Sequence, residues 1–63
     1  MNNGELLKKV NKCISAHKAA FEKWPNGNMR SFSVNEDGII IIRYRSGKWW
    51  HYRITESGKV EWW

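Results

Sequence analysis

Apolar side chains recur along residues 5–24 with the spacing of an α-helix. At the helical rotation of about 100° per residue they fall in one arc of about 140°, and lysine and other polar side chains occupy the opposite side. The arc contains Leu6, Val10, Cys13, Ile14, His17, Ala20, Phe21 and Trp24, with Leu7 at its margin. Pro25 follows, and proline cannot continue a helix because it lacks a backbone N–H and clashes with the preceding turn. We therefore predict one amphipathic helix over residues 5–24 that packs through this arc.

After the helix, polar and apolar residues alternate with a period of two, which is typical of half-buried strands. Three interruptions share one pattern, a glycine that follows two polar residues. They are Glu36-Asp37-Gly38, Arg45-Ser46-Gly47 and Glu56-Ser57-Gly58. Each fits a three-residue hairpin loop, in which a type I turn is followed by a glycine in the left-handed region. We predict a four-stranded antiparallel meander with strands over residues 29–35, 39–45, 48–55 and 59–63.

Loop length decides which side chains face the helix, because a register shift of one residue moves every side chain of a strand to the other face. A two-residue loop at Ser46-Gly47 would put Ile42 on the outer side of the sheet, whereas a three-residue loop pairs it with Trp50. Three-residue loops at all three turns give one consistent register, in which Arg53 also faces Glu61. The resulting core face contains Phe32, Val34, Ile40, Ile42, Tyr44, Trp50, Tyr52, Ile54, Val60 and Trp62. The sequence thus predicts an α+β fold with an N-terminal amphipathic helix packed on one face of the meander.

The opposite face of the predicted sheet has no cover, because a single helix cannot lie on both sides. It combines aromatic, isoleucine and arginine side chains, and such a patch on a small protein indicates contact with a partner. The candidate binding residues on and beside this face are Ile39, Ile41, Arg43, Arg45, Trp49, His51, Arg53 and Trp63. We predict that this surface carries the function.

The length of 63 residues predicts one domain, residues 1–63, near the lower size limit for independent folding. Cys13 is the only cysteine, so no disulfide can form within the chain, and the five tryptophans favour dense aromatic packing instead. The sequence does not start with a basic segment followed by an apolar run, and the longest apolar run, Ile39–Ile42, is too short to span a bilayer. Together with the unpaired cysteine, these features predict a cytoplasmic protein that does not enter a membrane.

The formal net charge of +5 is concentrated on the two central strands. Between Ile39 and Ile54 the chain has four basic residues and no acidic one. Aromatic rings that stack on bases, together with arginines that contact phosphates, are what a protein needs to hold a nucleic-acid strand. The outer side of the sheet therefore predicts a non-catalytic module that binds nucleic acid or another anionic ligand, and either a single strand or a duplex major groove fits this pattern.

A protein partner is the alternative. Isoleucine, tryptophan, tyrosine and arginine are common at the centres of protein interfaces. Two copies can pack face to face as a homodimer, or the edge strand that carries Trp62 and Trp63 can pair with another chain. The size and tryptophan content also suit a small inhibitor of another protein, of the kind that phages encode. Self-association and a foreign protein target thus stay open beside nucleic acid.

No residue pattern indicates catalysis, a metal or a cofactor. Cys13 and His17 are four residues apart, a spacing that can chelate a metal, but both lie within the apolar arc, where a buried cysteine and a hydrogen-bonded histidine are expected. Five of the six carboxylates fall at the predicted helix start, on its polar side or in turns, and Glu61 faces Arg53. Each glycine stands alone, so the sequence has no glycine-rich phosphate loop. We expect no enzyme activity, no metal site and no cofactor.

Overall fold

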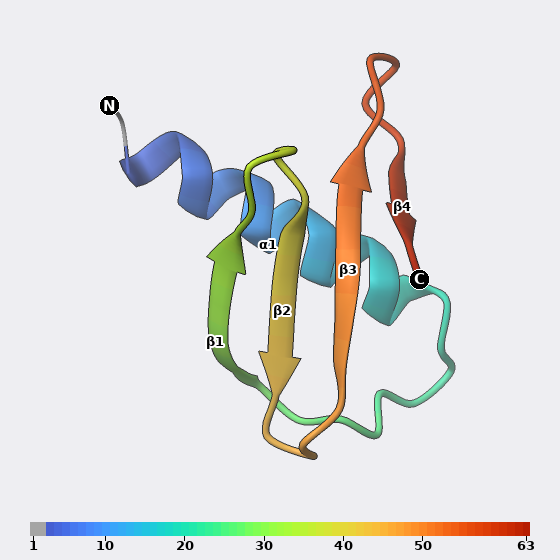
Figure 1. Ribbon diagram of the computed structural model, residues 1–63. Helices are drawn as coiled ribbons and strands as arrows, with labels where there is room; N and C mark the ends of the chain where they lie inside the picture. Colours follow the sequence, from blue (N-terminus) through green and yellow to red (C-terminus); the bar gives the residue numbers. More distant parts are fainter. Residues whose placement is uncertain (1–2) are drawn as a thin grey trace.

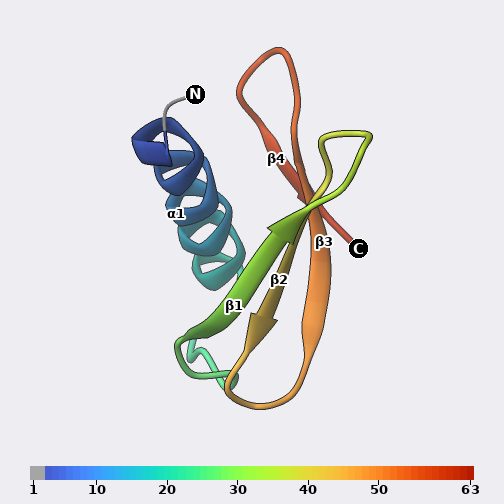
Figure 2. The same ribbon diagram turned by 60° about the vertical axis from the view of Figure 1, so that its left-hand side comes forward.

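The computed structural model describes residues 3–63, so residues 1 and 2 of the predicted domain lie outside the described residues. It confirms the α+β class, with one N-terminal helix on one face of a four-stranded antiparallel sheet (Figure 1, Figure 2). The elements are α1 (Asn3–Ala19), β1 (Met29–Val34), β2 (Ile40–Tyr44), β3 (Trp49–Ile54) and β4 (Val60–Trp62). The strands lie side by side in chain order, as a meander requires. No helix in the described part of the chain combines the length and the apolar character needed to cross a membrane.

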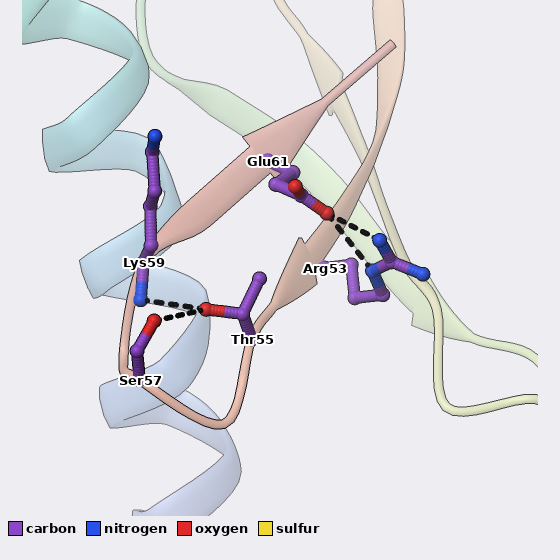
Figure 3. A network of polar contacts seen from close by, with 5 residues as sticks. All are labelled: Arg53, Thr55, Ser57, Lys59 and Glu61. Atoms are coloured by element: carbon purple, nitrogen blue, oxygen red, sulfur yellow. Dashed lines mark hydrogen bonds and ion pairs between the residues drawn. The ribbon is translucent and has the colours of Figure 1, made fainter.

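All three hairpin loops have the predicted geometry. Gly38, Gly47 and Gly58 have φ angles of 79°, 92° and 85°, in the region that residues with side chains rarely adopt. The N–H of each of these glycines donates to the carbonyl three residues earlier, which is the hydrogen bond of a β-turn. In the last loop, the Thr55 N–H donates to the Lys59 carbonyl at 2.8 Å, and the Thr55 hydroxyl accepts from the Lys59 N–H at 3.1 Å (Figure 3). The loops are therefore three residues long.

The strand pairing confirms the predicted register. Ile42 lies opposite Trp50, and Arg53 lies opposite Glu61. The pairing of β1 with β2 shifts in register between Met29 and Ser31. A shift of this kind twists an edge strand and makes it a poorer template for pairing with another chain. The two faces of the sheet consequently carry the side chains that alternation assigns to them.

The core lies between α1 and the inner face of the sheet. Its buried apolar residues are Val10, Cys13, Ile40, Ile42, Tyr44 and Tyr52. The helix packs mainly on β3 and β4, and so covers the β1 side of the sheet less. Val34 of β1 pairs with Ile40 as expected, but its side chain is 43% exposed. The prediction of Val34 as a core residue was therefore wrong, because the helix gives little cover on this side of the sheet.

The helix ends at Ala19, so the predicted end at Trp24 was wrong. The N–H groups of Ala20 and Phe21 donate to carbonyls three residues earlier, which is a tighter turn than an α-helix has. The chain then leaves the helix axis, and the Trp24 indole donates to the Gly27 carbonyl at 2.8 Å. Trp24 also precedes a proline, which disfavours helical backbone angles at the residue before it. Trp24 packs on the core from a loop, beyond the end of the helix. Its apolar side chain therefore extended the helical spacing in the sequence although the helix itself had ended.

The connection between α1 and β1 is fixed to the β2–β3 loop. Asn26 is buried, and its side-chain carbonyl accepts from the Ser46 hydroxyl at 2.9 Å. Its main-chain carbonyl accepts from the Ser46 N–H at 3.1 Å, and the Arg45 N–H donates to the Asn28 carbonyl at 3.0 Å. These hydrogen bonds fix the backbone of the loop that carries Arg45, one of the candidate basic residues.

A substitution at Gly38 tests the loop geometry. A β-carbon at this position would meet no atom within 4 Å, so Gly38→Ala changes only the backbone preference. Because φ is 79° there, we expect Gly38→Ala to lower the free energy of unfolding by about 1–2 kcal/mol. Gly38→Asn is the matched control and should cost less, since asparagine tolerates this conformation better. Urea denaturation measures both, and equal midpoints for Gly38→Ala and wild type would contradict the left-handed loop.

Candidate functional site

The candidate residues lie on the face of the sheet that is turned away from α1. Figure 2 shows the helix on one side of the sheet, and no helix or strand of residues 3–63 covers the other. We call this surface the outer face, and its residues are Ile39, Ile41, Arg43, Trp49, His51, Arg53 and Trp63. Arg45 lies at one end of it, in the β2–β3 loop. The structure thus brings all the predicted binding residues onto or beside one surface.

Three aromatic side chains form a continuous row on the outer face. The Trp49 and His51 rings meet edge to face, with centroids 5.2 Å apart, and His51 stacks on Trp63 at 5.3 Å with only 7° between the ring planes. Backbone hydrogen bonds between His51 and Trp63, at 3.1 and 3.2 Å, fix the second pair across β3 and β4. Trp49 is 51% exposed and Trp63 is 55% exposed. The row therefore offers flat ring surfaces to solvent from a hydrogen-bonded backbone.

Arginine side chains surround this row. Arg43 is exposed and lies opposite Trp49 in the β2–β3 pairing, and Arg45 is exposed in the adjoining loop. Arg53 donates through Nε to Glu61 Oε1 at 3.1 Å, and its Nη2 donates to the same oxygen (Figure 3). This ion pair is exposed, so it contributes little to stability. The charge of Arg53 nevertheless offsets that of Glu61, the acidic residue of β4. The outer face therefore keeps a positive charge from Arg43, with Arg45 beside it.

The isoleucines form the apolar part of the outer face. Ile41 lies between Ser33 of β1 and His51 of β3, and it is half-buried. Ile39 is also half-buried, and its N–H donates to the side-chain carbonyl of Asn35 at 3.0 Å. Neighbouring side chains thus cover part of both residues. The most exposed apolar surface on this face belongs to the tryptophans.

The inner face of the same strands contains a buried polar chain. His17 of α1 is buried, and its Nδ1 shares a hydrogen bond of 2.6 Å with the Tyr52 hydroxyl. The Tyr52 hydroxyl shares a second bond of 2.7 Å with the hydroxyl of Tyr44. The imidazole ring also contacts the aromatic rings of Phe21, Trp24, Tyr44, Trp50, Tyr52 and Trp62. This network ties α1 to β2 and β3, the two strands that carry most of the outer face.

Burial keeps the groups of this network uncharged. It lowers the pKa of His17 and raises the pKa values of Tyr44 and Tyr52, because a charge is poorly solvated among aromatic rings. Burial also raises the pKa of the Cys13 thiol, against a smaller opposing effect of Lys12. A protonated, buried thiol is a weak nucleophile. Within residues 3–63, no three His, Cys, Asp or Glu side chains gather as a metal site requires.

Two features of the site were not predicted from the sequence. The spacing placed His17 in the apolar arc and both tyrosines on the core face, but it did not pair them. A signal was present, since a histidine and tyrosines at core positions need hydrogen-bond partners when they are buried. The contact between Asn26 and Ser46 had no such signal, because both residues are ordinary in turns.

An open, shallow depression lies at the β4 edge of the sheet, beside the outer face. Its volume is about 470 Å³, and it is lined by Arg53, Glu61, Trp62 and Trp63. Comparison with protein-family models, with curated proteins and with solved structures found no match for this chain. The chemistry of the outer face is therefore the basis for inferring function.

The buried imidazole predicts a dependence of stability on pH. Because the pKa of His17 is lowered in the folded state, the unfolded state takes up its proton first as the pH falls. The stability from burying a neutral His17 is complete above the unfolded pKa of about 6.5 and is lost below it. We expect the free energy of unfolding, measured with urea, to decrease from about pH 7.5 to about pH 5.5, by at most about 1.4 kcal/mol per pH unit.

His51→Gln provides the control for this pH dependence, because it removes the other imidazole from the exposed side of the sheet. The decrease should persist in this variant. An unfolding free energy that is constant over the range, or a decrease that disappears in His51→Gln, would contradict the role of His17.

Proposed function

We propose that the chain is a non-catalytic module that binds single-stranded nucleic acid on its outer face. The observation that carries the proposal is the exposed row of Trp49, His51 and Trp63, with Arg43 opposite Trp49 on the neighbouring strand. Stacking of a base on an aromatic ring is worth about 1–3 kcal/mol by alanine substitution, and arginines neutralise phosphates. The rings and the charges lie together on a sheet face, which accepts an extended strand without a closed cleft.

The exposed rings favour a single strand over a duplex. Bases in a duplex are stacked on one another, so a protein in the groove reaches their edges and not their faces. Trp49 and Trp63 would then keep much of their apolar surface in water. Unpaired bases can lie flat against both rings, which removes that surface from solvent.

The charges support an anionic partner. Arg43 and Arg45 are exposed, and neither β2 nor β3 contains an acidic residue. Glu61 of β4 is paired with Arg53 and so does not oppose the other two arginines. Phosphate contacts of the two unpaired arginines, Arg43 and Arg45, with a single strand predict a plot of log affinity against log salt with a slope of about −1.4.

Self-association is the competing use of the outer face. Two copies packed face to face would bury Ile39, Ile41 and the exposed tryptophans, as protein interfaces commonly do. The outer face carries a net positive charge, however, so two copies of it would repel each other, and like charges across an interface cost free energy. The positive charge thus supports a nucleic acid better than a second copy of this chain.

Fluorescence anisotropy with a labelled oligothymidine of about ten nucleotides tests the proposal. We expect roughly micromolar affinity at low salt, decreasing with the slope of about −1.4 as salt rises from about 50 to about 200 mM. Arg43→Glu should abolish binding, because it replaces a phosphate contact by a repulsive charge beside Trp49.

Lys8→Glu is the matched control for this experiment. It makes the same change in charge at an exposed position of α1, on the other side of the sheet, and should reduce binding little. An equal loss in both variants would mean attraction by net charge alone, and no binding by the wild type at low salt would refute the proposal. A light-scattering mass of about twice the monomer, with no binding, would instead favour self-association as the role of this chain.

A further inference from the structure

The free side of β1 presents backbone groups that no other strand of residues 3–63 pairs with, because β1 forms one edge of the sheet (Figure 1). In an antiparallel pair, residues that exchange backbone hydrogen bonds alternate with residues that do not. The Asn35 N–H donates to the Ile39 carbonyl at 3.0 Å, so by this alternation Ser33 also bonds toward β2. The N–H and C=O groups of Phe32 and Val34 consequently point away from β2. This edge has the groups needed to accept a further strand.

The shift in register between Met29 and Ser31 protects only the start of this edge. From Ser31 to Val34 the pairing with β2 is regular, so the outward backbone groups keep the spacing of an ordinary strand. The opposite edge is β4, which is three residues long and has α1 packed against it. The edge of β1 is therefore the better template of the two.

Apolar surface next to the β1 edge is only partly covered. Phe32 is half-buried and Val34 is 43% exposed on the inner face, since α1 packs mainly on β3 and β4. Figure 1 shows the first turns of α1 extending past the β1 edge, and Leu7 in this part of the helix is 47% exposed. A strand added to β1 would remove apolar surface of the sheet from water, which favours association.

We propose that two copies of this chain pair antiparallel through β1 and join their four-stranded sheets into one. A register centred on Ser33 pairs Phe32 of each copy with the partner's Val34, and these are the residues with outward backbone groups. It also brings Arg30 of each copy beside the partner's Glu36, and both side chains are exposed. Registers centred on Phe32 or Val34 would instead set a charged residue against an apolar one. The edge is thus complementary to itself in charge and in apolar contacts.

The dimer leaves the outer face open. The two-fold axis of antiparallel edge pairing is perpendicular to the sheet, so both helices lie on one side of the joined sheet and both outer faces on the other. Arg43 and Trp49 of each copy stay accessible. Dimerisation through β1 therefore goes beyond the proposed binding of nucleic acid and does not depend on it.

Sedimentation equilibrium of the full chain from about 10 μM to about 1 mM, without nucleic acid, tests the dimer in the range expected of a small interface. We expect the mass to rise toward twice that of the monomer. Arg30→Glu should weaken dimerisation about tenfold, because it sets two glutamates against each other at both ends of the contact. Glu36→Arg should weaken it similarly, and the two substitutions combined should restore it, because they exchange the charges.

Lys59→Glu is the matched control, since it makes the same change in charge at an exposed position beside the opposite edge and should leave the dimer intact. Val34→Pro removes an outward N–H without breaking a bond to β2 and should abolish the dimer, with circular dichroism to check its fold. A mass that stays monomeric or rises beyond the dimer would overturn the proposal. So would an equal loss in Lys59→Glu, or a combined variant as weak as the single ones. Absence of nucleic-acid binding alone would refute the proposed function and leave the dimer standing.

Discussion

The structure depends on one constraint, which is that each hairpin loop contains three residues and ends in a left-handed glycine. Side chains alternate along a strand, so one residue more or less in a loop would move the side chains of a whole strand to the opposite face. Gly38, Gly47 and Gly58 hold this alternation in phase through all four strands. Because of this, the tyrosines of β2 and β3 point into the core, while Arg43 and Trp49 point away from it.

The two faces are linked because the same strands supply both. On the inner side, Tyr44 and Tyr52 form a hydrogen-bonded chain with His17, which fixes β2 and β3 against α1. On the outer side, β2 and β3 place arginines and rings in adjacent rows, and Trp63 joins them directly after β4. The core network thus holds the backbone on which the outer face is built, so its rings are already in place for the strand that we propose to bind there. Preorganisation of this kind reduces the entropy lost on binding.

The sequence was sufficient where local chemistry decides the outcome. The three glycine loops determined the register, and the register placed the outer-face residues and the pair of Arg53 and Glu61 correctly. It was insufficient where contacts distant in the chain decide. Trp24 has helical spacing but packs on the core from a loop, and Val34 alternates correctly but lies where α1 gives little cover. The stacking of His51 on Trp63 depends on ring orientations, which periodicity does not contain.

The most direct test of the outer face is a nitrogen–proton NMR titration of the tryptophan indoles with oligothymidine. We predict that the indole signals of Trp49 and Trp63 shift or broaden as the strand is added, because their rings are exposed on the outer face. The Trp24 indole should keep its position, since it donates to the Gly27 carbonyl on the other side of the molecule. Unchanged Trp49 and Trp63 signals, together with shifts at Trp24 or along the lysines of α1, would contradict binding at the outer face.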